Sequence, residues 1–259
     1  MDLGQHFLVD KSIVDKIVNS LELNSEDVVL EIGGGKGTLT ENIVEKVKRL
    51  YVIEIDEKLV NLLKNKFVKY NNIEIIKGNF LDFDFKKFFD KKIKIVGNVP
   101  YSITSDILEK IFLSIDIWCL CVLMLQKEVV QKLIAKPKET FFSKLTLTAN
   151  FYTEIKFVCD VEKEKFSPQP KVNSAVVKFS PKEDFLSFKY KENFFKIIDI
   201  AFKCKRKTLL NSLSLGLKIN KEKIKKILVN SDVNFKQRPH ETSLEQYLKI
   251  TEKLSKFID

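Results

Sequence analysis

Residues 28–37 constrain the fold more than any other part of this sequence. They read Val-Val-Leu-Glu-Ile-Gly-Gly-Gly-Lys-Gly, a short apolar run that ends in glycines and leads into a segment with helical spacing. Apolar β-branched residues favour a buried strand, and glycines allow a tight turn whose bare backbone N–H groups can approach a ligand. The stretch therefore predicts a strand, a glycine turn and a helix, with a ligand site at the turn.

Strand-like and helix-like segments alternate along the first half of the chain. The expected strands are 28–32, 50–55, 73–77, 93–97 and 117–125, and the expected helices are 11–21, 38–47, 57–69, 85–89, 102–112 and 126–135. This alternation predicts parallel pairing through right-handed crossovers, and hence a doubly wound α/β sheet. Two further strands, 152–161 and 174–180, flank a proline-rich loop and predict an antiparallel hairpin at the edge of that sheet.

The composition shifts at residues 181–188, which suggests a domain boundary. Beyond it we expect four helices, 192–204, 206–213, 221–230 and 244–257, so the chain divides into a sheet domain (1–181) and a small all-helical domain (182–259). Of the net charge of +10, residues 182–259 carry +8, from 18 Lys and Arg against 10 Asp and Glu. A lysine-rich composition explains many lysines but not this asymmetry, so the helical domain is predicted to bind a polyanion such as RNA.

Several classes of protein are excluded by composition. No apolar run approaches the ~18 residues of a membrane span, and the first residues lack a basic, apolar leader. The four cysteines form no C-x-x-C pair, only two histidines accompany them, and no metal site is expected. Cys119 and Cys121 are expected to be core residues of one strand. We therefore expect a reduced, cytoplasmic setting. The protein is also expected to be a monomer.

The glycine turn and the strand after it predict a nucleoside ligand. Gly33, Gly35 and Gly37 follow G-x-G-x-G, whereas Thr38 stands where the dinucleotide fingerprint G-x-G-x-x-G requires glycine, which argues against NAD. Glu54 ends the next expected strand, where a carboxylate can accept hydrogen bonds from both hydroxyls of a ribose. The alternative role for Glu54, capping the following helix, suits Asp56 better.

The residues that follow the third expected strand, 73–77, suit an adenine base. Asn79 follows that strand and offers both a donor and an acceptor to an adenine amine and ring nitrogen. Phe80, the next residue, is placed to lie along the ring. The tripeptide Gly78-Asn79-Phe80 would elsewhere be an ordinary turn and gains this meaning only from its position after the strand.

Residues 98–101, Asn-Val-Pro-Tyr, are the most specific motif. They contain no carboxylate, thiol or histidine, so they cannot by themselves run acid–base or covalent chemistry. They suit transfer of a group to the exocyclic amine of a base. The Asn98 side-chain oxygen and the backbone carbonyl of Pro100 or a neighbour can accept hydrogen bonds from the two N–H groups of that amine. Tyr101 offers a face on which a flipped base stacks. Phe166 is either the opposite face of that stack or one core phenylalanine among 21.

Four motifs, in this order, resemble the ribosomal RNA adenine N6-dimethyltransferases, a family of class I S-adenosylmethionine-dependent methyltransferases. They are residues 4–8 (GQHFL), 31–37 (EIGGGKG), 98–101 (NVPY) and 166–177 (FSPQPKVNSAVV), and residues 202–213 (FKCKRKTLLNSL) resemble the small-subunit branch. The resemblance implies a Rossmann-like doubly wound methyltransferase sheet, S-adenosyl-L-methionine as cofactor, and small-subunit rRNA within a pre-ribosomal subunit as partner. It implies transfer of two methyl groups to N6 of each of two adjacent adenines near the 3′ end of that rRNA.

The same resemblance implies roles for individual residues. It implies cofactor contacts from Gln5, His6, Leu8, Gly33, Gly35, Gly37, Glu54, Ile55, Asn79, Phe80 and Asn98, catalytic roles for Asn98, Pro100, Tyr101 and Phe166, and RNA contacts from Lys203, Lys205, Arg206 and Lys207. His6 and Leu8 would shape the methionine side of the pocket, and Asn98 would bridge donor and acceptor. The chain departs from the family where Asn79 replaces the usual Asp, His6 the commoner Asn, and Val99 the usual Leu or Ile. The basic arm before residue 4 is also short.

Three other functions stay open at this point. A large-subunit rRNA adenine N6-methyltransferase conferring antibiotic resistance shares the fold, cofactor and target atom, but the Gly4-Gln5 start and residues 205–208 argue against it. A DNA adenine methyltransferase would need a sequence-reading module, which is not recognisable here. A ribosome assembly factor without catalysis is disfavoured by the intact glycines, Glu54 and residues 98–101.

Overall fold

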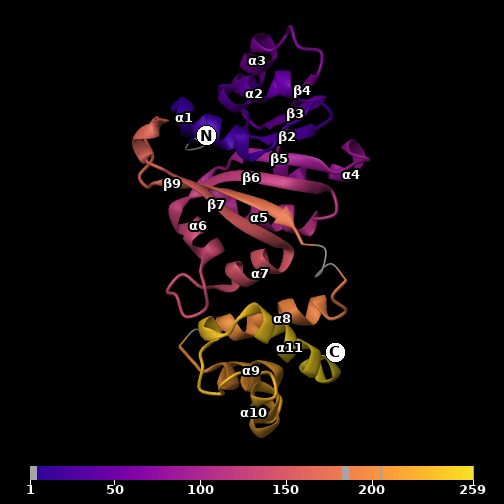
Figure 1. The fold of residues 1–259 in the computed structure, drawn as a ribbon, viewed down its shortest axis with the longest axis vertical. Coiled ribbons are helices and arrows are strands. Elements are labelled where there is room, and N and C mark those ends of the chain that lie inside the picture. The colour runs from indigo at the N-terminus through magenta and orange to yellow at the C-terminus, as the bar shows by residue number, and fades with distance from the viewer. Residues whose placement is uncertain (1–4, 183–186, 205, 259) are drawn as a thin grey trace. The chain divides into compact units, whose positions relative to one another are not determined.

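The chain forms two compact units, shown in the computed structural model of Figure 1, which describes residues 5–182, 187–204 and 206–258. The first unit comprises residues 1–130 and 154–181, and the second comprises residues 131–153 and 182–259. The chain passes from the first unit to the second at the predicted boundary, residue 181. It also does so after residue 130, because residues 131–153 join the C-terminal helices instead of the sheet. The reason is apolar packing: Phe151 stacks on Phe194 with ring centroids 4.8 Å apart.

A seven-stranded sheet organises the first unit, in the order β4-β3-β2-β5-β6-β9-β7. Its strands are β2 (Val28–Ile32), β3 (Arg49–Glu54), β4 (Ile73–Lys77), β5 (Ile93–Asn98), β6 (Trp118–Gln126), β7 (Thr153–Val161) and β9 (Ser174–Pro181). Strands β2 to β6 pair in parallel, and β9 pairs antiparallel with β6 in a register that sets Gln126 opposite Ser174. The chain winds outward from β2 in one direction and returns to β5 on its other side, so the predicted doubly wound sheet is confirmed. Strands β9 and β7 lie at its edge.

Short helices precede, connect and follow the parallel strands (Figure 1). They are α1 (Lys11–Ser20), α2 (Thr38–Ile43), α3 (Glu57–Lys66), α4 (Phe85–Phe88), α5 (Thr104–Leu113) and α6 (Lys127–Ile134). Side-chain caps fix where three of them begin: Asp10 accepts a hydrogen bond from the Ile13 N–H, Asp56 accepts one from the Lys58 N–H, and Asp84 accepts one from the Lys86 N–H. The sequence predicts each of these helices, although some predicted helices, such as 38–47 and 57–69, extend beyond the observed ends.

Two features of the fold have no counterpart in the sequence prediction. Helix α7 (Lys144–Tyr152) precedes β7, and a separate two-stranded ribbon joins β1 (Phe7–Leu8) to β8 (Phe166–Ser167) in antiparallel pairing. Two-residue strands are too short to give a periodic signal. The ribbon matters because it ties the N-terminal segment to the proline-rich loop.

The second unit is helical, as the sequence predicts. Its helices beyond α7 are α8 (Lys191–Lys203), α9 (Leu209–Leu217), α10 (Lys221–Val229) and α11 (Leu244–Leu254). Phe194, Leu213, Leu228 and Tyr247 are fully buried between them. Within the described ranges, no helix has the length and apolar character to span a membrane.

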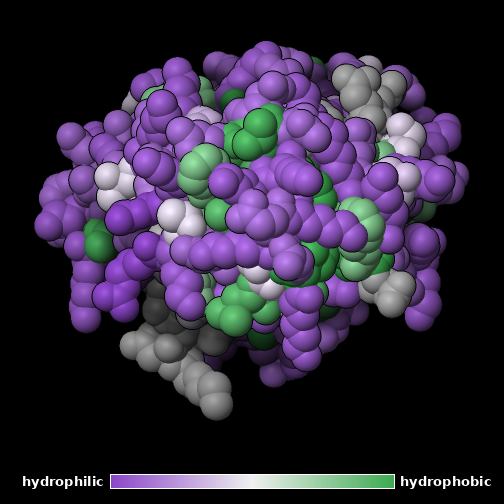
Figure 2. All heavy atoms as spheres, turned by 90° about the horizontal axis from the view of Figure 1, so that it is seen from below, coloured by the Kyte–Doolittle hydropathy of each residue, from purple (hydrophilic) through white to green (hydrophobic). Residues whose placement is uncertain are grey.

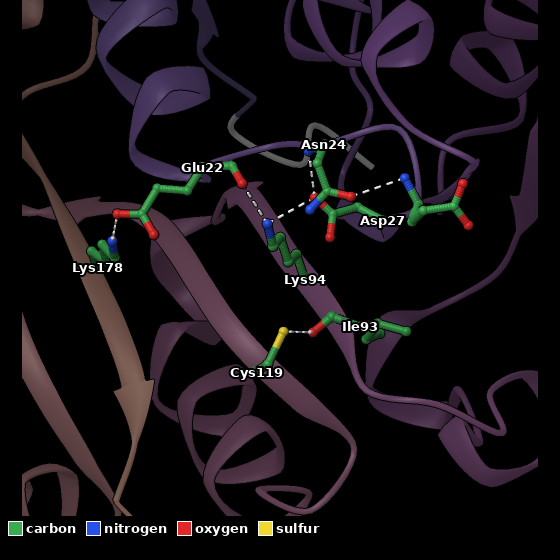
Figure 3. Close-up of polar contacts among 8 residues, drawn as sticks. Glu22, Asn24, Asp27, Ile93, Lys94, Cys119 and Lys178 are labelled. Atoms are coloured by element: carbon green, nitrogen blue, oxygen red, sulfur yellow. Dashed lines mark hydrogen bonds and ion pairs between the residues drawn. The ribbon is translucent and has the colours of Figure 1, made fainter.

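A buried ion pair closes the end of the sheet where β2 and β5 begin (Figure 3). The Lys94 Nζ donates to the Glu22 backbone oxygen at 2.6 Å and to the Asp27 carboxylate at 2.7 Å. The two side chains of the pair are only 11% and 14% exposed. Nearby, the Cys119 thiol points at the Ile93 carbonyl oxygen and is exposed, so the prediction of a core residue holds for Cys121 and is wrong for Cys119.

Candidate active site

A glycine turn follows β2, as predicted, at the carboxyl end of the sheet. Gly33, Gly35 and Gly37 have φ angles of +73°, +54° and +81°, a region that side chains with a Cβ rarely enter. The Gly33 N–H donates to the Ile53 carbonyl oxygen at 2.8 Å, which ties the start of the turn to β3. The turn is therefore specified by its own backbone and fixed against the neighbouring strand.

Glu54, the last residue of β3, holds this turn. One carboxylate oxygen accepts the Gly35 N–H at 2.9 Å, and the other accepts the N–H groups of Ile55 at 2.9 Å and Asp56 at 3.0 Å. The side chain is only 3% exposed, yet it lines the pocket described below. Three backbone donors fix its orientation, so the carboxylate is a preorganised acceptor for a ligand.

A second acid, Glu31, lies on β2 shortly before the turn and has a raised pKa. Burial raises the pKa of Glu31 to about 8, although the Thr40 hydroxyl donates to it at 2.7 Å, and the nearby Glu54 adds to the rise. Glu31 is 1% exposed. At neutral pH the Glu31 carboxyl therefore keeps its proton.

The third strand end brings Asn79 and Phe80 to the same place. The Asn79 side-chain oxygen accepts the Leu81 N–H at 3.0 Å and so caps the short helical turn at residues 80–82. This bond leaves its NH2 group as the donor available to a base. Phe80 packs edge-on against Phe85, with ring centroids 5.7 Å apart, and forms part of the apolar wall.

Asn98 ends β5 beside the glycine turn. Its side-chain NH2 donates to the His6 backbone oxygen at 2.8 Å. Among the described residues, no protein donor is recorded for the Asn98 side-chain oxygen, which is therefore the acceptor that this corner offers. The Pro100 carbonyl oxygen, in contrast, already accepts the Ile103 N–H at 3.3 Å and the Thr104 hydroxyl at 3.2 Å.

The N-terminal segment crosses this corner on the β1–β8 ribbon. His6 Nδ1 lies 2.8 Å from the Pro168 carbonyl oxygen, and the His6 ring lies 5.9 Å from the Tyr101 ring. Phe7 covers the turn, because a Cβ on Gly35 would lie 3.1 Å from its ring. The ribbon thus positions two rings over the strand ends.

These groups enclose one pocket of about 250 Å³. Its lining residues from the sequence prediction are Gln5, His6, Gly33, Gly35, Glu54, Ile55, Asn79, Phe80, Asn98, Pro100 and Tyr101. Strand ends far apart in the chain therefore converge as the motifs predict. In the described part of the chain, no cluster of three or more His, Cys, Asp or Glu is placed to hold a metal ion.

Three predicted site residues lie outside this pocket lining. Leu8 and Phe166 face each other across the ribbon, 5% and 4% exposed, and both belong to the hydrophobic core. Of the two interpretations of Phe166, its burial favours the core phenylalanine. Leu8 packs in the same core and so holds the ribbon against it. Gly37 ends the turn against Phe67, 2.8 Å from where a Cβ would stand, so it serves the turn's packing.

Sequence reasoning missed the apolar wall and one polar contact. Besides the predicted Phe80, the wall includes Phe7, Ile32, Ile53, Leu81, Ile103 and Ile107. Apolar residues at strand ends carry no signal that separates pocket from core. The contact is between the Tyr101 hydroxyl and the Ser174 hydroxyl, 2.7 Å apart. Residues 73 positions apart can be paired only by the fold.

The predicted RNA-contact residues lie in the second unit. Lys203 ends α8, and Arg206 and Lys207 follow it; all three are exposed, whereas Lys205 lies outside the described residues. Figure 2 shows one face of the molecule, which is mostly hydrophilic with scattered hydrophobic residues. Their role in RNA binding stays a prediction.

The sheet order, the glycine turn and the pocket at the strand ends define a Rossmann-like α/β methyltransferase. More narrowly, the chain belongs to the ribosomal RNA adenine dimethylase family, whose model matches residues 1–256.

Relatives of known name cover almost the whole chain. It is 42% identical over 245 residues to the ribosomal RNA small subunit methyltransferase A of Mycoplasma mobile, a match that covers 95% of this chain and 94% of the relative. A solved dimethyladenosine transferase from Plasmodium falciparum is 27% identical, with a TM-score of 0.87 over 97% of this chain and 98% of that one. The solved 23S rRNA methyltransferase ErmE is 25% identical, with a TM-score of 0.78 over 96% and 99%.

Proposed function

We propose that the protein transfers methyl groups from S-adenosyl-L-methionine to N6 of two adjacent adenines near the 3′ end of small-subunit rRNA, giving N6,N6-dimethyladenosines. It would act on a pre-ribosomal subunit in the cytoplasm during ribosome biogenesis. One observation carries the proposal: the glycine turn, the Glu54 carboxylate and the Asn98 amide line a single pocket. Family membership supports the reaction class, and the name of the Mycoplasma mobile relative supports the small subunit.

The residues of the pocket fit the proposed cofactor. Glu54 would accept a ribose hydroxyl at Oε2, because this oxygen accepts only the Gly35 N–H, whereas Oε1 already accepts the N–H groups of Ile55 and Asp56. Asn79 and Phe80 would contact the adenine, and the amides of the glycine turn would face the methionine portion. When bound, S-adenosylmethionine supplies a methyl group on a cationic sulfur that becomes neutral on transfer.

Asn98 would prepare the accepting amine. The amine of adenine is a weak nucleophile because its lone pair is delocalised into the ring, and an acceptor on its N–H bonds favours a pyramidal nitrogen. The Asn98 side-chain oxygen is aligned for this by the bond from its NH2 group to the His6 carbonyl oxygen. The Pro100 carbonyl could take the second N–H only in exchange for one of its long bonds to Ile103 and Thr104.

Alignment, and not proton transfer, would supply most of the rate. Residues 98–101 contribute no carboxylate, thiol or histidine. Burial raises the pKa of Tyr101, so its phenol stays neutral at physiological pH. The protein would hold the amine in line with the methyl group and exclude water, while the released proton passes to solvent.

The decisive experiment incubates the protein with unmethylated small subunits and S-adenosylmethionine, followed by mass spectrometry of the digested rRNA. We expect two adjacent dimethyladenosines near the 3′ end, and none without the cofactor. Absence of any methylated adenine in small-subunit rRNA would refute the proposal. Isolated large subunits are treated in parallel, and their rRNA is mapped by primer extension. This tests the alternative, methylation of 23S rRNA, which the name of ErmE indicates.

A non-catalytic role in ribosome assembly is the competing function from another class. It predicts binding to small subunits without S-adenosylmethionine and no methylation with it. The positive charge of residues 182–259 supports RNA binding under either function. Methylation therefore separates the two, and binding alone does not.

A further inference from the structure

The Tyr101 ring is the aromatic surface that residues 98–101 present to the pocket. Tyr101 begins the short helical turn at residues 101–103, directly after Pro100, and is partly buried. A ring in this position can rotate and tilt about its side-chain bonds unless something holds its far end. The usefulness of the ring as a stacking surface for a base therefore depends on what fixes its plane.

Ser174 is that anchor. Its hydroxyl oxygen lies 2.7 Å from the Tyr101 hydroxyl oxygen, and the serine is 0% exposed. Among the described residues, no other partner of the Ser174 hydroxyl is recorded. Because water does not reach it, the two hydroxyls satisfy each other, and each would lose its partner if the other were removed.

The position of Ser174 makes it a rigid anchor. It is the first residue of β9 and pairs with Gln126 at the end of β6. Strand β6 in turn pairs with β5, in a register that sets Asn98 opposite Met124. The residue that holds Tyr101 and the residue that offers the amide acceptor therefore belong to one continuous sheet.

The loop before Ser174 also positions the second ring of the site. The Pro168 carbonyl oxygen lies 2.8 Å from His6 Nδ1, within hydrogen-bond distance. The His6 and Tyr101 rings are tilted by 33° to each other, with centroids 5.9 Å apart. One segment, residues 168–174, thus contacts and positions both rings.

We propose that Ser174 is a positioning residue for methyl transfer: it fixes the plane of the Tyr101 ring so that a flipped adenine stacks with its amine at the Asn98 oxygen. This inference rests on the proposed function. It concerns a residue that touches neither cofactor nor base and acts through the tyrosine. Its effect should therefore fall on the rate of transfer and spare cofactor binding.

A double-mutant cycle on methyl transfer tests the inference. Ser174→Ala and Tyr101→Phe each remove one hydroxyl of the pair, and each should lower kcat about tenfold, the worth of one hydrogen bond. The double variant should be no slower than either single variant, because both break the same bond. Cofactor affinity, measured by calorimetric titration, should stay within about twofold of the unmutated protein.

A matched control separates positioning from stability. Ser231 is also 0% exposed, and its hydroxyl donates to the Ile227 carbonyl oxygen at 2.8 Å within the helical unit. Ser231→Ala should lower the melting temperature without changing kcat at a temperature where the variant is folded. Should Ser174→Ala behave in the same way, the serine is merely structural and the inference is overturned.

The remaining outcomes are equally informative. Rate losses that multiply in the double variant would mean that Ser174 acts independently of Tyr101, which also overturns the inference. If the unmutated protein methylates no small-subunit adenine, the proposed function fails instead. The two failures are thus distinguishable in one set of assays.

Discussion

The Asn98 side-chain NH2 donates to the His6 backbone oxygen at 2.8 Å, across 92 positions of sequence. This bond joins the end of a central strand to the N-terminal segment that crosses the pocket. It also decides which end of the amide faces the ligand, because the donor is used and the oxygen is left open. The amide thus has a structural and a chemical task at once.

Asn98→Ala should abolish methyl transfer, with a loss of at least about a hundredfold in kcat, the usual effect of removing a preorganised polar group. Cofactor binding should survive in part, because Glu54 and the glycine turn are untouched. Transfer of a tritiated methyl group and calorimetric titration measure the two effects separately. Turnover near that of the unmutated protein would contradict the role given to the amide.

Glu31→Gln should stabilise the protein increasingly as the pH rises from 5 to 8. Burial raises the pKa of Glu31 from the usual 4.5 to about 8. Between these values the folded protein keeps a proton that the unfolded chain has lost, so the free energy of unfolding falls by up to about 1.4 kcal/mol per pH unit. Thermal unfolding of both proteins across this range checks the slope. A gain that does not vary with pH would mean that Glu31 is ionised.

Gly97→Ala should destabilise the sheet at the pocket by about 1–3 kcal/mol. A Cβ at residue 97 would lie 2.8 Å from the Ile32 carbonyl oxygen, on a neighbouring strand that cannot move away. The shift would displace Asn98 and weaken cofactor binding. Gly78→Ala is the control, because Gly78 lines the pocket and a Cβ there would meet no atom within 4 Å. Equal melting temperatures for the two variants would contradict this explanation.

Asp27→Ala should cost about 3 kcal/mol of stability, because it leaves the Lys94 ammonium group buried without its carboxylate. Adding Lys94→Met should recover most of the loss, since the unpaired charge is then removed. Lys249→Ala, which breaks an exposed pair with Asp232 from within a helix, should have little effect. Denaturant unfolding of these variants beside the unmutated protein measures the differences. A double variant no more stable than Asp27→Ala would refute the account.

RNA binding should weaken steeply with salt, because each phosphate contact releases counterions. Replacing Lys203, Arg206 and Lys207 by Ala should lower the slope of log affinity against log salt by about two to three. A triple variant at the exposed Lys86, Lys91 and Lys92 of the first unit is the charge-matched control and should keep the slope. A flat salt dependence in the unmutated protein would contradict electrostatic binding.

Local patterns in the amino-acid sequence are enough to predict the parallel sheet, its strand and helix order, and the polar residues at the strand ends of the pocket. The reason is that β-branched runs, helical spacing and glycines act over a few residues, and the strands of a doubly wound sheet end at a common edge. Glu54, Asn79 and Asn98 can therefore be assigned to one site before any contact is known. The four C-terminal helices follow from the same periodicity.

Long-range packing, in contrast, separates the side chains that reach the pocket from those that support it. Phe166 and Leu8 turn into the core because an antiparallel ribbon pairs them, and Ser174 meets Tyr101 because β9 lies beside β6. Helix α7 joins the C-terminal unit through aromatic stacking on α8. Such contacts link residues far apart in the chain, and their energies depend on burial and geometry that no local pattern encodes.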